Sequence, residues 1–160
     1  MGKKGFYIKR IFLALILILP AVQSAFAESL TREHSGGGIE IDVTLLNPGA
    51  VYSGDDLIFD VGMNTHSVPL DQYVMEELSY VRDERGRVFK ALAWELPKGG
   101  GHHRFGKLKF SGKDKDDSPI IMKDDKYIEV VIKDVGGIKE RVLRWELPII
   151  LGVKIEGGLL

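Results

Sequence analysis

Short segments in which apolar and polar residues alternate one by one recur along this chain, and no other feature constrains its fold as strongly. The first clear example covers residues 39–45 and ends at the turn sequence Asn47-Pro48-Gly49. Alternation with a period of two places the apolar side chains on one face of a β-strand. Each such segment therefore predicts a half-buried strand.

Seven segments of this kind predict an all-β domain. The other six are expected near residues 57–63, 78–82, 88–96, 105–110, 128–132 and 143–147. Short strands separated by turns are typical of a two-sheet antiparallel β-sandwich of immunoglobulin-like size. In the fourth segment Val88, Leu92, Trp94 and Leu96 are expected to share the buried face. The one helical candidate is residues 70–78, where Asp71 is expected to cap a single turn.

The N-terminal segment has the layout of a secretory signal peptide. Basic residues precede an apolar run that starts at Ile11, and the small-residue sequence Ala25-Phe26-Ala27 follows it. This layout predicts cleavage after Ala27 and a periplasmic or secreted protein. A bilayer-spanning helix needs roughly 20 apolar residues and this run is shorter, so we expect no stable membrane insertion after cleavage. A retained, uncleaved anchor is the alternative.

The predicted domain organisation has four parts. A signal peptide covers residues 1–27, a flexible lead-in 28–38, the β-sandwich 39–148 and an apolar tail 149–160. The lead-in is polar and ends in a serine and three glycines, a composition typical of flexible linkers. The tail is too short to cross a bilayer and predicts a docked strand or a frayed end.

Composition excludes several classes of function. The chain has no cysteine, which excludes thiolate metal sites, cysteine nucleophiles and disulfides. Cleavage after Ala27 would leave 18 basic and 23 acidic residues, a net charge of about −5. An acidic surface gives no electrostatic reason to expect nucleic acid. The expected partner is an unidentified protein or small ligand.

Strand order predicts which loops share an end of the sandwich. Sequential antiparallel strands reverse direction, so alternate connections lie at the same end. This rule groups residues 64–77, 97–104 and 134–138, and the first two of these loops contain three of the four histidines. We call this the histidine end. The opposite end is expected to carry ordinary solvated turns.

The histidines predict a metal site. Neutral imidazole is a common ligand of zinc and copper, so His66 with His102 or His103, supported by Asp71, is a candidate transition-metal site. Adjacent strand residues point to opposite faces, so His102 and His103 reach one ion only where the preceding glycines bend the backbone. Arg104 completes the candidate ligand-binding set. The alternative is that these side chains form a hydrogen-bonded network that fixes the loops.

No catalytic residue is predicted, and the chain is not expected to be an enzyme. Ser67 follows His66, but neighbours in sequence rarely face each other and no Gly-x-Ser-x-Gly motif is present. Asp114 and the acidic residues after it match part of a calcium-loop spacing, but Pro119 stands where the sharp turn needs glycine. A solvated charged loop is the favoured interpretation there.

Several motifs carry a resemblance to a known group of proteins. They are Thr65-His66-Ser67 with Leu70-Asp71, Ala93-Trp94-Glu95, Gly100-Gly101-His102-His103-Arg104, and Asp134-Val135-Gly136-Gly137 with Glu140-Arg141-Val142. Across most of residues 40–148 the chain resembles a family of exported bacterial and archaeal β-sandwich proteins without an assigned activity. The resemblance implies a shared fold and supplies no catalytic residues. Pro69 stands where similar sequences are expected to have an acidic residue, which weakens a carboxylate role there.

Three functional hypotheses follow. The leading one is a non-enzymatic extracytoplasmic binding module whose histidine end holds a ligand, with a transition metal as one candidate. The alternative is a structural or protein-interaction domain without a metal. A metal-assisted hydrolase is the weakest of the three, and the fold alone does not choose among them.

Overall fold

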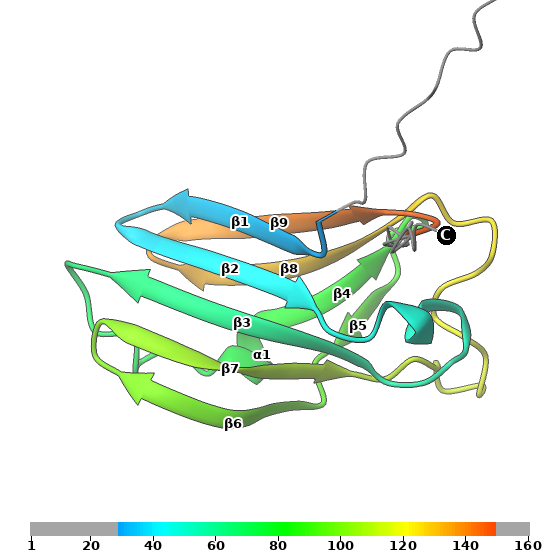
Figure 1. Ribbon diagram of the computed structural model, residues 1–160, viewed down its shortest axis with the longest axis horizontal. Coiled ribbons are helices and arrows are strands. Elements are labelled where there is room, and N and C mark those ends of the chain that lie inside the picture. The colour runs from blue at the N-terminus through cyan, green and yellow to red at the C-terminus, as the bar shows by residue number, and fades with distance from the viewer. Residues whose placement is uncertain (1–28, 150–160) are drawn as a thin grey trace, which may run out of the picture.

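The computed structural model describes residues 29–149, which form two antiparallel β-sheets packed face to face (Figure 1). The predicted signal peptide, and the predicted tail except Ile149, lie outside the described residues. The all-β, two-sheet prediction is confirmed. The predicted number of strands is wrong, because the described residues contain nine strands.

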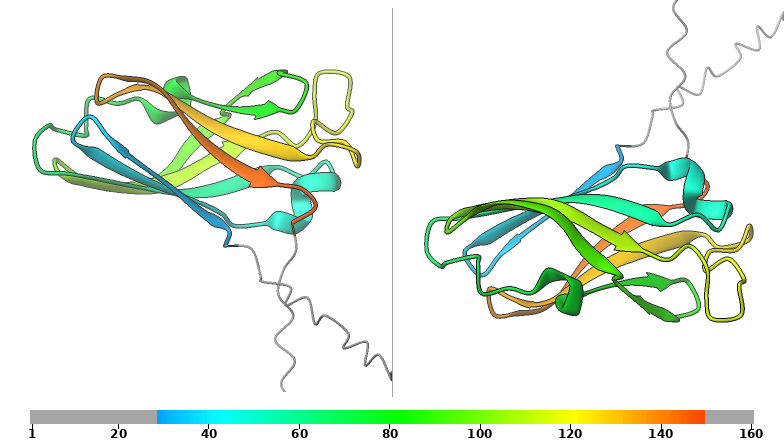
Figure 2. Two further views of the ribbon diagram at one scale, coloured as in Figure 1. Left: turned by 90° about the horizontal axis from the view of Figure 1, so that it is seen from above. Right: turned by 90° about the horizontal axis from the view of Figure 1, so that it is seen from below.

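The two sheets have five and four strands. Sheet A has the order β1 (Thr31–Gly36), β2 (Ile39–Leu45), β3 (Leu57–Thr65), β7 (His103–Phe110), β6 (Ala93–Gly100). Sheet B has the order β5 (Val88–Lys90), β4 (Ser79–Asp83), β8 (Tyr127–Val135), β9 (Ile138–Glu146). The helical turns are η1 (Pro48–Tyr52) and α1 (Met75–Leu78). The views along the sheets in Figure 2 show the two layers.

The core lies between the sheets and is built by the alternation seen in the sequence. Phe59 of sheet A and Trp145 of sheet B are fully buried, with ring centres 5.2 Å apart. Met63 is also fully buried, as its place in the β3 alternation predicts. Trp94 is half-buried and packs against the same cluster. Both tryptophans therefore contribute to the core, where aromatic burial stabilises a cysteine-free sandwich.

Strand β1 corrects the prediction of a flexible lead-in over residues 28–38. It pairs with β2 along its whole length, from Thr31 opposite Thr44 to Gly36 opposite Ile39. The two-residue turn Gly37-Gly38 joins the strands with φ angles of +58° and +72°, which suit glycine. An edge strand such as β1 is held by the hydrogen bonds of the ladder and needs little apolar surface. Its sequence is therefore polar and lacks the alternation by which the other strands were predicted.

The strand predicted over residues 88–96 is two strands in different sheets. β5 pairs with β4 in sheet B, β6 pairs with β7 in sheet A, and the chain crosses between the sheets after Lys90. A bulge between Glu95 and Lys98 then shifts the phase of β6. Leu96, within the bulge, is 66% exposed, and Leu92, in the segment that crosses between the sheets, is 59% exposed, so neither is buried beside Trp94. Val88, at the start of β5, is 53% exposed.

The helical segment predicted over residues 70–78 is shorter than expected. Only α1, four residues long, is helical, and Val74 rather than Asp71 stands at its N-cap. The Asp71 carboxylate accepts a hydrogen bond from the Gly101 backbone N–H at 2.7 Å instead. Within residues 29–149 no helix is long and apolar enough to cross a membrane.

The outer face of sheet B contains one buried carboxylate, and it makes stability depend on pH. Glu129 accepts hydrogen bonds from Arg82 at 2.8 Å and from Arg144 at 2.6 Å. Burial alone would raise the pKa of Glu129, but these hydrogen bonds outweigh it and hold the pKa below its ordinary value. Because the pKa of Glu129 is lower in the folded state than its value of about 4.3 in the unfolded state, ionised Glu129 stabilises the fold above about pH 4.3. This contribution is lost as the pH falls through the folded-state pKa.

We therefore expect Glu129→Gln to flatten the acid side of the stability profile. Urea unfolding at several pH values between 6 and 3 should show a steeper loss of unfolding free energy for the wild type than for the variant. Glu33→Gln is the matched control on an exposed carboxylate of sheet A. Parallel profiles for the wild type and Glu129→Gln would contradict the expectation.

Candidate functional site

The loops grouped by strand order do lie together, at the left of Figure 1. The Thr65 backbone N–H donates to the His102 carbonyl oxygen at 3.0 Å, which joins the loop after β3 to the β6–β7 hairpin. The Gly136 N–H donates to the Tyr73 hydroxyl at 3.1 Å, which joins that loop to the β8–β9 hairpin. The predicted histidine end is confirmed. A fourth connection, the β1–β2 turn, joins it because Thr65 Oγ1 donates to the Gly38 carbonyl at 2.7 Å.

Arg141 is the buried centre of this end. Its side chain is fully buried and donates to the carbonyl oxygens of Gly36 at 2.6 Å and Val135 at 3.1 Å. It also lies 3.1 Å from His34 Nδ1. Burial lowers the pKa of the guanidinium. No carboxylate pairs with it among residues 29–149, so main-chain oxygens satisfy the charge and thereby join the β1–β2 and β8–β9 hairpins.

Two of the predicted ligand residues make hydrogen bonds inside the protein. The Arg104 guanidinium donates to the Leu70 and Tyr73 carbonyl oxygens and lies 5.7 Å from the centre of the Trp94 ring. The Asp71 carboxylate binds the Gly101 N–H of the β6–β7 hairpin. These two side chains position the loops, which is the role that the alternative hypothesis assigned to the group.

The three histidines do not assemble into a metal centre. Strand register places His103 opposite Asn64 on the outer face of sheet A, where His103 Nδ1 donates to Asn64 Oδ1 at 2.8 Å. His102 is exposed in the turn, and His66 is exposed after β3. Across residues 29–149 no group of three or more histidine, aspartate or glutamate side chains is arranged to hold a metal ion. The predicted site over His66, His102 and His103 therefore has no geometric support.

A hollow of about 330 Å³ with both polar and apolar walls opens at the histidine end, between the β1–β2 turn and the loop after β3. It is lined by Ser35, Gly36, Gly38, Ile39, Glu40, Asn64, Thr65, His66 and Ser67. These residues offer hydroxyl, amide, imidazole and carboxylate groups and no lysine or arginine. We call this hollow the end pocket.

A second hollow of about 440 Å³ continues from the end pocket along the outer face of β1, β2 and β3. The two share Ser35, Glu40 and Asn64. Of the predicted site residues, only His66 lines the end pocket. Sequence reasoning missed Ser35 because it was assigned to the lead-in. The two-glycine turn Gly37-Gly38, directly before the strand that starts at Ile39, was the signal for a hairpin and so for a strand containing Ser35.

Arg141 was also missed, although the sequence carries a signal for it. It falls in the same phase of β9 as Leu143 and Trp145, which are both buried. A charged residue at an apolar position of a strand indicates a buried, hydrogen-bonded group. Glu129 in β8 carries no such signal, because Ile128, Val130 and Ile132 define the apolar phase of that strand and Glu129 falls in the other one.

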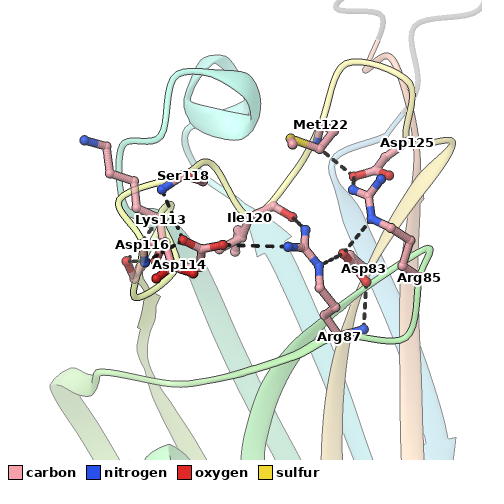
Figure 3. Close-up of polar contacts among 11 residues, drawn as sticks. Asp83, Arg85, Arg87, Lys113, Asp114, Asp116, Ser118, Ile120, Met122 and Asp125 are labelled. Carbon is pink, nitrogen blue, oxygen red and sulfur yellow. Dashed lines mark hydrogen bonds and ion pairs between the residues drawn. The ribbon is translucent and has the colours of Figure 1, made fainter.

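The opposite end is more ordered than the expected solvated turns. Figure 3 shows Asp83 and Asp125, both buried, bound to arginines: Arg87 Nε lies 2.7 Å from Asp83, and Arg85 Nη2 lies 2.8 Å from Asp125. Asp114 accepts hydrogen bonds from two backbone N–H groups of its own turn. These carboxylates hold the long loop between β7 and β8 and serve a structural purpose.

Comparison with known proteins adds little to this geometry. No model of a protein family matches the chain, and no curated protein matches it. Among solved structures, it is similar to the secreted protein MPT63 of Mycobacterium tuberculosis, with 16% identity and a TM-score of 0.41 over 77% of this chain and 99% of that one. It is also similar to a DUF4426 family protein of Pseudomonas aeruginosa, with 12% identity and a TM-score of 0.41 over 72% and 93%. Likeness at this level does not extend to function.

Proposed function

We propose that this chain is a non-enzymatic binding module that acts outside the cytoplasm and holds a small polar ligand in the end pocket. The observation that carries the proposal is that hydrogen bonds already fix the pocket walls. Thr65 anchors the loop after β3 to the β1–β2 turn, and His103 fixes the amide of Asn64. A pocket that is ordered before binding loses little conformational entropy when the ligand arrives.

The pocket lining defines the chemistry of the ligand. Ser35 and Ser67 can donate or accept, the Asn64 amide nitrogen donates, and Glu40 accepts. A volume of about 330 Å³ is at the lower end for small-molecule sites. These groups suit a compact ligand with several hydroxyl or amide groups. His103 is a positioning residue, because it acts through Asn64.

The geometry around Ser67 supports binding over hydrolysis. Its hydroxyl lies 3.4 Å from Thr65 Oγ1, and no hydrogen bond joins it to the adjacent His66. A serine nucleophile needs a base within hydrogen-bond reach. The bonds of Asp71 and Arg104 inside the protein favour a second candidate, a protein-interaction domain in which this end is purely structural.

An NMR titration of the ¹⁵N-labelled chain over residues 28–160 tests the proposal. Maltotriose, triglycine and zinc chloride serve as separate probes. We expect a saturable shift of the Gly36, Asn64 and Ser67 amide signals with at least one of the two organic probes. Ser35→Trp should abolish that shift, because the indole fills the pocket.

Ser118→Trp is the matched control, since Ser118 is exposed in the loop at the opposite end. It should leave the titration unchanged. Pocket signals that move with neither organic probe would favour the interaction-domain candidate. Stoichiometric zinc shifts of the His66 and His103 rings would reinstate the metal hypothesis.

A further inference from the structure

The outer face of sheet A is divided into an acidic half and a basic half. Four carboxylates project from β1, β2 and β3, namely Glu33, Glu40, Asp42 and Asp60. The β6–β7 half has three lysines, Lys98, Lys107 and Lys109, and one carboxylate, Glu95, so its net charge is positive; Lys109 pairs with Asp56 at 2.9 Å. No ion pair involves Asp42 or Lys98 in the part of the chain that the structure describes. Both charges are therefore available to a partner.

Strand register arranges these side chains in rows across the face. The central row reads Asp42, Gly62, Phe105, Lys98 from β2 to β6. The next row toward the opposite end reads Thr44, Asp60, Lys107, Glu95. In each row a carboxylate on the β1 side and a lysine on the β6 side lie equally far from the line between β3 and β7. Two copies of the face can therefore pair so that each carboxylate meets a lysine.

We propose that this face binds a second copy of the chain around a twofold axis parallel to the strands, midway between β3 and β7. Such an axis keeps each row in place and exchanges its two halves. It sets Asp42 against Lys98 of the partner subunit and Asp60 against Lys107 of the partner subunit. Each pair occurs twice, once on either side of the axis.

The exposed apolar residues of the face lie in its basic half. Phe105 is 44% exposed, and the axis sets it against Gly62 of the partner subunit, over which the Asp42 carboxylate of that subunit lies. Leu96, 66% exposed, lines a hollow of about 330 Å³ beside Phe105. On the acidic half, the hollow of about 440 Å³ includes Asp42 and offers space for a lysine stem. Phe105 and Leu96 thus add exposed apolar surface beside the proposed charge pairs, and interfaces commonly combine both kinds of contact.

Pairing through the edges of sheet A is a poorer solution than pairing through this face. The β6 edge is interrupted by its bulge and by Pro97, which has no backbone N–H to donate. The other edge, β1, lies beside β9, where Arg32 Nε donates to the Arg144 carbonyl oxygen at 2.5 Å.

The dimer also has a functional consequence. Because the axis runs along the strands, it presents both histidine ends in the same direction and favours bivalent binding.

Sedimentation equilibrium of the chain over residues 28–160 tests the proposal, with 50 mM and 500 mM sodium chloride as conditions. We expect a monomer–dimer equilibrium that weakens at the higher salt. Asp42→Lys and Lys98→Glu should each weaken the dimer about tenfold, because each change sets like charges together twice. The double variant Asp42→Lys with Lys98→Glu should recover the wild-type constant.

Recovery by the double variant distinguishes the interface from a folding effect. Within one chain Asp42 and Lys98 are three strand spacings apart, about 14 Å, so the swap restores no internal pair. Lys123→Glu, an equal charge change in an exposed loop, is the matched control and should leave the constant unchanged. A chain that stays monomeric up to about 1 mM at low salt would overturn the proposal. A double variant no tighter than the single variants would do so as well.

Discussion

Arg141→Ala is expected to lower the free energy of unfolding by about 3 kcal/mol or more. The side chain is fully buried, and its removal leaves a cavity and deprives the Gly36 and Val135 carbonyl oxygens of their charged donor. Those carbonyls belong to two different hairpins, so the histidine end should loosen as well. Urea denaturation measures the loss, and hydrogen exchange of the β1–β2 turn measures the loosening.

Two further variants separate the causes. Arg141→Met keeps much of the volume and removes every donor, so a loss close to that of alanine would assign the effect to hydrogen bonding. Lys139→Ala, an exposed position on the same strand, should change the free energy by less than about 0.5 kcal/mol. A loss below about 1 kcal/mol for Arg141→Ala would contradict the central role given to this residue.

Gly106→Ala is expected to destabilise the sandwich by about 2 kcal/mol, although it adds only one methyl group. A Cβ atom at this position would lie 2.5 Å from the Trp94 ring. Trp94 comes from the neighbouring strand and is half-buried over Gly106, with Leu108 as its cross-strand partner. The ring has to move, which disturbs its packing and its contact with Arg104.

A double-mutant cycle tests this clash directly. Trp94→Phe provides the space that the methyl group needs, so the double variant should be more stable than the sum of the two single losses implies. Gly49→Ala is the matched control, because no atom lies within 4 Å of the point where its methyl group would stand. Additive losses, or a Gly106→Ala variant as stable as Gly49→Ala, would show that the Trp94 ring is not the obstacle.

Local pattern predicted the sandwich and the position of its histidine end. Alternation identifies the buried face of a strand, and strand reversal assigns each loop to an end, so both inferences need only sequence order. The errors came where this local signal is weak. β1 is held by main-chain pairing, and the break between β5 and β6 follows from which sheet each strand joins.

The candidate site was harder to predict than the fold, because it depends on which side chains meet. The sequence suggested a cluster of His66, His102 and His103. The structure instead pairs His103 with Asn64 through strand register and leaves Ser35, from a strand that was not predicted, to line the pocket with His66. The types of residue in the loops therefore indicated the correct end of the sandwich, but they did not indicate which side chains come together there.

By itself the sequence determined that this chain forms an antiparallel sandwich without cysteine and which loops gather at one end. Short-range alternation and turn chemistry are enough for that. Only the tertiary structure decided that Arg141 binds the carbonyl of Gly36, 105 residues earlier in the chain, and that the two halves of sheet A have opposite charge. Contacts of this range are set by the pairing of distant strands, which the pattern of each strand alone does not specify.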